Sequence, residues 1–143
     1  MKAMAMIGAG LLVGALLVGC AEGGFQPQVP TSNPDLRGVV TSIAWGDDAN
    51  ASARVVWTDD PAVGAKAGYD AAQVAIVKGT DIQRKVDGGY EPASDAELKV
   101  GTIVEVWFTG AVAESYPVQA TAATVAIVGV YDGELPVPPG LGP

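Results

Sequence analysis

The sequence contains no histidine and only one cysteine, Cys20. Zinc sites in proteins are built largely from Cys and His ligands, and both the Ser-His-Asp triad and the Cys-His dyad require a histidine. A single cysteine also has no partner for an internal disulfide. We therefore expect a protein with no metal site, no cofactor and none of these nucleophilic reaction centres.

Positive charge is scarce as well. Eight Lys and Arg side chains stand against sixteen Asp and Glu side chains, which gives a formal net charge of −8 at pH 7. Binding to the phosphate backbone of a nucleic acid requires clustered basic side chains. The composition therefore excludes nucleic acid as the expected partner, and it indicates a protein that is kept dispersed by its own negative charge.

The acidic residues do not form a calcium-binding motif. Asp47-Asp48 and Asp59-Asp60 flank one expected strand, so they would lie about 25 Å apart at ~3.3 Å per residue and could not share one ion. The chain also has no Asp-x-Asp-x-Asp-Gly loop. We interpret both pairs as solvated turn residues.

A long hydrophobic run is missing too. Ala3 to Val18 carries no charge, but a bilayer span needs ~20 apolar residues, and this run is shorter and diluted by glycine. Lys2 precedes the run, and Leu17-Val18-Gly19-Cys20 ends it, which is the pattern of a secretory signal with its cleavage site. The alternative interpretation is an uncleaved transmembrane anchor.

The residues from Leu17 to Cys20 resemble the lipobox of bacterial lipoproteins, in which the cysteine is acylated and becomes the mature N-terminus. The resemblance implies a membrane attachment through lipid on Cys20 and an extracytoplasmic place in the cell envelope. Ala21 after the cysteine resembles an outer-membrane sorting signal, if the host has two membranes. The processed chain would carry seven basic and sixteen acidic side chains, a net charge of −9.

Composition divides the chain into four parts. We expect residues 1–19 to be the signal peptide and residues 20–35 to be the lipidated cysteine with a flexible tether. Residues 36–130 form the expected β-barrel domain, and residues 131–143 read as a Pro/Gly-rich disordered tail. The folded part has room for one hydrophobic core, and we expect a monomer.

Alternating apolar and polar residues predict an all-β fold with five strands. The expected strands are Arg37 to Trp45, Ala51 to Thr58, Gln73 to Lys85, Thr102 to Thr109 and Gln119 to Val130. Ser94 followed by Glu97 is a capping-box signature and predicts one short helical turn between the third and fourth strands. This order matches a small five-stranded OB-like barrel; a small sandwich or an open meander is the alternative.

Several segments together resemble a family of small secreted or lipid-anchored bacterial proteins of unknown function, related to a Bacillus protein called YobA. The specific pieces are Val106-Trp107-Phe108-Thr109-Gly110 and Glu114-Ser115-Tyr116-Pro117-Val118-Gln119, and Arg37-Gly38-Val39-Val40-Thr41 opens the similar region. The resemblance extends to about Val128. It implies a barrel of this type, an extracytoplasmic address and no established activity.

The stretch around Trp107 is the first candidate for a site. Val104, Val106 and Phe108 alternate with Glu105 and Trp107, so the Trp lies on the face opposite the expected core. It is either a stacking platform for a ligand or a Trp covered by a loop or tail, with its indole N–H bonded locally.

The loops between strands one and two and between strands four and five frame the ligand surface of barrels of this type. Here these loops are acidic and flanked by aromatic residues, which favours a cationic or polyhydroxylated ligand, or a basic surface of an envelope protein. Alternatively, the loops are only structural turns. The candidate binding residues are Trp45, Asp47, Asp48, Trp107, Glu114, Ser115, Tyr116 and Gln119.

A carboxylate-dependent cell-envelope hydrolase is the second functional class. Glu105 and Glu114 are the acids of the signature stretch, and a glycoside hydrolase would need two carboxylates facing one another across a cleft. The expected barrel, the lipid anchor and the missing catalytic residue types favour a binding or interaction module instead.

Replacement of the lipobox cysteine tests the anchor. Cys20→Ser removes the thiol that would be acylated, so we expect an unprocessed precursor and no incorporation of labelled fatty acid. Metabolic labelling and the mass of the protein measure both effects. Equal labelling of the mutant and the wild type would contradict the lipoprotein interpretation.

Overall fold

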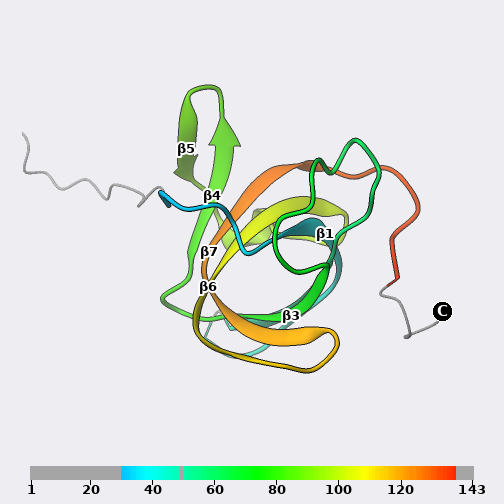
Figure 1. Cartoon of the computed structure of the whole chain (residues 1–143). Helices are drawn as coiled ribbons and strands as arrows, with labels where there is room; N and C mark the ends of the chain where they lie inside the picture. Colours follow the sequence, from blue (N-terminus) through cyan, green and yellow to red (C-terminus); the bar gives the residue numbers. More distant parts are fainter. Residues whose placement is uncertain (1–29, 49, 138–143) are drawn as a thin grey trace, which may run out of the picture.

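The computed structural model of the chain describes residues 30–48 and 50–137, so the expected signal peptide and Cys20 lie outside the described residues. The described part contains seven strands and one 3₁₀ turn (Figure 1). Their bounds are β1 Leu36–Trp45, β2 Ala51–Val56, β3 Ala71–Ile76, β4 Asp81–Val86, β5 Gly89–Pro92, η2 Asp95–Glu97, β6 Thr102–Ala113 and β7 Val118–Val130.

Five of the strands close into a barrel. The hydrogen-bonded order is β3-β2-β1-β6-β7-β4-β5, and an additional pairing joins β3 to β7. This last pairing is parallel and links Ala72–Ala75 to Val118–Thr121, whereas the other contacts around the barrel are antiparallel. The all-β, OB-like five-stranded barrel predicted from the sequence is confirmed.

The core follows directly from the alternation along the strands. Residues of one face point inward and are buried because side chains alternate between the two faces of a strand. Val104 and Val106 of β6 are fully buried, as expected, and Phe108 packs at the margin of the same cluster. The other members of the core cluster include Val40, Val55, Val74, Leu98 and Val125.

The prediction of the third strand is wrong in one respect. The stretch predicted as one bent strand from Gln73 to Lys85 forms two strands, β3 and β4, separated by a turn. The amide of Val77 donates to the Thr80 hydroxyl at 3.0 Å, and that hydroxyl donates to the carbonyl of Ala122 at 2.7 Å. The turn moves the chain along β7, so that β3 and β4 both pair with it in parallel.

The strand β5 was not predicted. It returns antiparallel to β4 and makes a hairpin that projects from the barrel (Figure 1). The Gly88-Gly89 pair lies at the turn of this hairpin, where Gly88 has φ of 87°. Glycine adopts this left-handed conformation at no steric cost.

The predicted helical turn is present as η2. Ser94 is its N-cap and accepts from the amide of Ala96, while the Glu97 carboxylate accepts from the amide of Ser94 at 2.9 Å. That bond, followed by the hydrogen bond from Arg84, lowers the pKa of Glu97. Arg84 also pairs with Glu91, so one guanidinium joins β4, β5 and η2.

The contacts of the barrel extend a few residues beyond both ends expected for the domain. At the N-terminal end, the amide of Asp35 donates to the carbonyl of Val106 at 2.9 Å. At the C-terminal end, the amide of Tyr131 donates to Gly101 at 2.7 Å, and its hydroxyl donates to Asp60 at 3.2 Å. Within residues 30–48 and 50–137, no helix has the length and hydropathy to span a membrane.

Val106 offers a direct test of this core. Its side chain is completely buried, so Val106→Asp would place an unpaired charge in the barrel interior and should lower the free energy of unfolding by more than about 4 kcal/mol. Val130→Asp is the matched control because Val130 is 80% exposed at the end of β7. Urea denaturation of both variants measures the difference, and similar midpoints would contradict the assigned core.

Candidate functional site

The outer face of β6 is covered rather than open. Trp107 is only 7% exposed, and its indole Nε1–H donates to the carbonyl of Ser32 at 2.9 Å. The ring of Tyr90, from the projecting hairpin, meets it edge-on with 6.4 Å between ring centroids. Of the two interpretations of Trp107, the covered side chain with a local hydrogen bond agrees with the structure. Trp107 is therefore not a stacking platform.

The segment that covers Trp107 is held in place by the carboxylate and the backbone of Asp35. The Asp35 carboxylate accepts from the amide of Phe108 at 2.8 Å, and the Asp35 carbonyl accepts from the amide of Tyr69 at 3.0 Å. Gly68 approaches so closely that a Cβ there would lie 2.2 Å from the Asp35 carbonyl oxygen. We call residues 32–35 the N-terminal strap.

Glu105 is a buried acid, 3% exposed, in the wall of the barrel. Its carboxylate pairs with the guanidinium of Arg37, and the hydroxyl of Tyr90 donates to it at 3.3 Å. Partial burial first, and then the charge of Glu105, raise the pKa of the Tyr90 hydroxyl. A buried charge needs such partners to offset its lost hydration, so Glu105 has a sufficient structural role.

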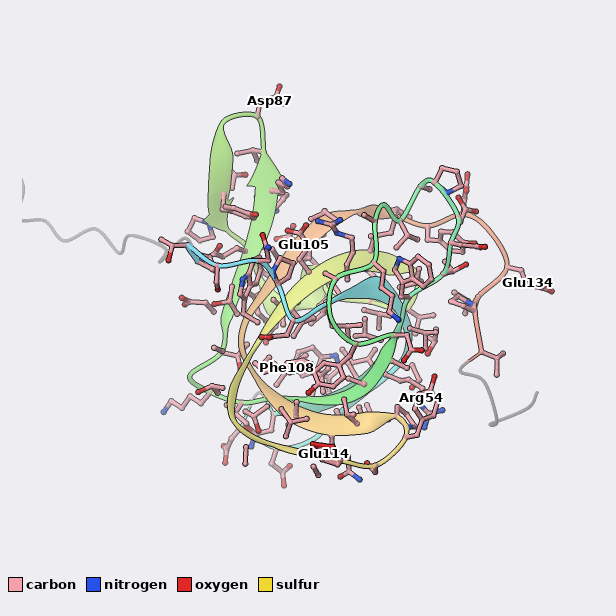
Figure 2. All side chains as sticks on the ribbon, viewed as in Figure 1. Arg54, Asp87, Glu105, Phe108, Glu114 and Glu134 are labelled. Carbon is pink, nitrogen blue, oxygen red and sulfur yellow. The ribbon has the colours of Figure 1, made fainter. Side chains whose placement is uncertain are left out.

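The two acids considered for a hydrolase do not face one another. Figure 2 shows Glu105 near the strap and Glu114 at the far end of the barrel. Glu105 pairs with Ala126 in the middle of the β6–β7 ladder, whereas Glu114 follows the last residue of β6 and is exposed. The described residues also contain no group of three or more His, Cys, Asp or Glu arranged to hold a metal ion.

The remaining aromatic candidates lie at opposite ends of β3. Trp45 pairs with Ala51, which pairs with Ile76 at the end of β3. Tyr116 lies by Asp70, just before β3 begins, and burial followed by the Asp70 charge raises the pKa of its hydroxyl. A six-residue strand is about 17 Å long. Trp45 and Tyr116, 42% and 48% exposed, therefore do not converge on one site, and Trp107 is buried.

A groove of about 370 Å³ lies on the outer surface of β2, β3 and the β6–β7 hairpin. Its lining residues are Ser52, Gln73, Ala75, Ala111, Val112, Ala113, Gln119, Ala120 and Thr121. An irregularity in β6 makes the room. Thr109 pairs with Thr121 and Ala113 pairs with Gln119, so residues 110–112 stand opposite Ala120 alone. Gly110 begins this bulge with φ of 74°.

The floor of the groove is polar and uncharged. The Nε2 of Gln73 donates to the Ser52 hydroxyl at 2.7 Å, and its Oε1 accepts from Arg54 Nε at 3.2 Å. The parallel pairing sets Gln119 directly beside Gln73 and Thr121 beside Ala75. Two carboxamides and two hydroxyls therefore share one surface, with small apolar side chains between them.

The structure brings only part of the predicted site together. Gln119 lines the groove, and Glu114, Ser115 and Tyr116 belong to the exposed loop that follows its β6 wall. The Ser115 hydroxyl donates to the Pro117 carbonyl at 2.9 Å, a local turn contact. Asp47 and Asp48 are exposed between β1 and β2 and are not among the residues that line the groove.

The polar groove residues that were not predicted from the sequence are Ser52, Gln73 and Thr121. Each is a polar residue facing outward between buried neighbours, as in Ala51-Ser52-Ala53 and Ala72-Gln73-Val74. The alternation marks them as outward-facing. It does not indicate that three separate strands set them side by side.

The Arg37–Glu105 pair can be tested by its effect on stability. Arg37→Ala leaves Glu105 buried without its counter-ion and should cost about 3 kcal/mol of unfolding free energy. The double variant Arg37→Met/Glu105→Leu removes both charges and should lie within about 1 kcal/mol of the wild type. Urea denaturation measures each. Arg84→Ala, which removes an exposed ion-pair partner, is the control; a larger loss there than for Arg37→Ala would contradict the structural role of Glu105.

Comparison with known proteins gives a similarity over part of the chain and no activity. Residues 74–129 match the model of a family described as a protein of unknown function, DUF3221. No curated protein and no solved structure matches the chain. The matched region runs from β3 to β7, so it includes Gln119, Thr121 and the β6 wall of the groove. In this region the chain is similar to that family.

Proposed function

We propose that this protein is a lipid-anchored, extracytoplasmic binding module whose ligand occupies the groove between β2, β3 and the β6–β7 hairpin. The single observation that carries the proposal is the oriented carboxamide of Gln73, held by Ser52 and Arg54 beside Gln119 in a groove of about 370 Å³. The groove also lies on the strand and loop surface that barrels of this type use for ligands.

The lining favours a polyhydroxylated ligand over a cationic one. The nine lining residues include no carboxylate, and the acids of the two neighbouring loops are exposed to water, which screens their charge. Carboxamides and hydroxyls both donate and accept hydrogen bonds. Such groups match the hydroxyls of a sugar, and the small side chains of Ala75 and Ala111 leave room for its ring.

The position of the floor argues against binding by strand addition. The backbone groups of β2, β3 and β7 are already engaged in one another's ladders. A peptide that adds a strand needs a free sheet edge. Recognition on this surface therefore depends on side chains, which suits an oligosaccharide.

The anchor and the family relation are parts of the same proposal. The lipobox-like residues ending in Cys20 support attachment to the membrane. Ser32, which lies twelve residues after Cys20, accepts a hydrogen bond from Trp107 of the barrel. An extended chain of that length reaches roughly 40 Å, which would keep the barrel close to the envelope surface. The Trp-Phe-Thr-Gly and Glu-Ser-Tyr-Pro-x-Gln segments support a relation to the YobA-related proteins.

The ligand site is tested by screening the purified, processed chain in detergent against an oligosaccharide array. Gln73→Ala and Gln119→Ala should each weaken any bound oligosaccharide by about tenfold, because each removes a hydrogen-bonding carboxamide from the floor. Thr31→Ala is the control: it removes an exposed hydroxyl ahead of β1, outside the groove. A hit whose affinity is unchanged by both glutamine substitutions would show that the groove is not the site.

A further inference from the structure

Arg54 stands beside the groove and is held in place by it. It lies in the middle of β2, half-buried, and faces outward between the buried Ala53 and Val55. Its Nε donates to the Oε1 of Gln73 at 3.2 Å. Figure 2 shows its side chain pointing away from the barrel wall. The guanidinium is therefore an oriented group at the margin of the proposed site.

The other two arginines of the described region are used by acids of the chain. Arg37 pairs with Glu105, and Arg84 pairs with Glu91 and Glu97. Arg54 has no such pair among residues 30–48 and 50–137; its strand partners are Ser42 and Gln73. In a chain with twice as many acidic as basic side chains, an arginine paired with an amide is unusual.

The hydrogen bond between Arg54 and Gln73 does not use the two terminal nitrogens of the guanidinium. Only Nε is engaged by Gln73, which leaves the two terminal nitrogens for another acceptor. A guanidinium offers its donors as a planar fork that fits a carboxylate with two parallel hydrogen bonds. The same Gln73 carboxamide lines the groove, so a ligand lying on Gln73 would pass within reach of this fork.

We infer that the ligand of the groove is an oligosaccharide bearing a carboxylate, and that Arg54 binds this carboxylate while Gln73 and Gln119 bind neighbouring hydroxyls. This inference rests on the proposed function of the groove. It adds a specificity-determining residue and narrows the ligand class from a polyhydroxylated compound to an acidic sugar.

The surrounding charges restrict how acidic the ligand is. Asp70 lies next to Tyr116 and Glu114 stands in the exposed loop after β6, and the chain as a whole is strongly negative. A polymer with a charge on every unit would be repelled. The fitting ligand carries carboxylates separated by neutral sugars, with hydroxyl or N-acetyl groups between them.

Two tetrasaccharides of matched length test the inference by calorimetry on the processed full chain in neutral detergent. In the hyaluronan tetrasaccharide, glucuronate alternates with N-acetylglucosamine, whereas tetra-N-acetylchitotetraose is neutral throughout. The wild type should bind the first at least about tenfold more tightly, which is the scale of a charge-assisted hydrogen-bonded pair. Arg54→Gln should abolish this preference, and Arg54→Lys should keep part of it because a point charge replaces the fork.

Lys66→Gln is the matched control. It removes the same charge from an exposed loop residue that does not line the groove, so the preference should persist. Circular dichroism and the melting temperature of each variant establish that it is folded. Equal loss of preference in Lys66→Gln and Arg54→Gln would reduce the effect to net charge and overturn the inference.

The remaining outcomes separate the inference from the function on which it rests. If the wild type binds both tetrasaccharides equally and Gln119→Ala weakens both, the groove is a sugar site and the role of Arg54 is wrong. If a short peptide with a free C-terminal carboxylate binds through Arg54 more tightly than either sugar, the ligand class is wrong. If neither sugar binds, the inference falls, and with no array hit the proposed sugar site falls with it.

Discussion

The parallel pairing of β3 with β7 is the interaction on which the rest of the structure depends. Four residue pairs, from Ala72–Val118 to Ala75–Thr121, turn an open sheet into a barrel. Without them both strands would expose unpaired backbone groups along an edge, and Val74 would lose the far wall of its core. The same pairs bring Gln73 beside Gln119. Closure of the barrel and assembly of the groove floor therefore depend on the same strand pairing.

The strand β6 shows how a small barrel is buried on both sides. Its inner face supplies Val104 and Val106 to the core, while its outer face is covered by the N-terminal strap and the β4–β5 hairpin. The buried Glu105 on that outer face is stabilised by an ion pair with Arg37 and a hydrogen bond from Tyr90. The coverage leaves the surface of β2, β3 and β7 as the open side, where the proposed ligand lies.

Prediction from the sequence succeeded where the signal is local. The alternation of Val104, Val106 and Phe108 marked the core face, and Ser94 with Glu97 marked the capped turn, because each depends on residues a few positions apart. It failed at Val77 to Thr80, where the chain breaks between β3 and β4 and the Thr80 hydroxyl donates to the Ala122 carbonyl on the neighbouring strand β7. Of the residues that line the groove, the sequence singled out Gln119 within a motif but not its neighbours on β2 and β3.

The sequence by itself determined the all-β class, the inward face of strands such as β6, the acidic charge and the absence of histidine. These follow from composition and from a two-residue period, which need no knowledge of the partner strand. Only the tertiary structure decided that Ser32 covers Trp107, that β6 bulges opposite Ala120, and that Gln73 lies beside Gln119 in one groove and contacts Arg54 at its margin. These contacts join residues far apart in the chain, and their register depends on how the strands pair, which a local pattern does not contain.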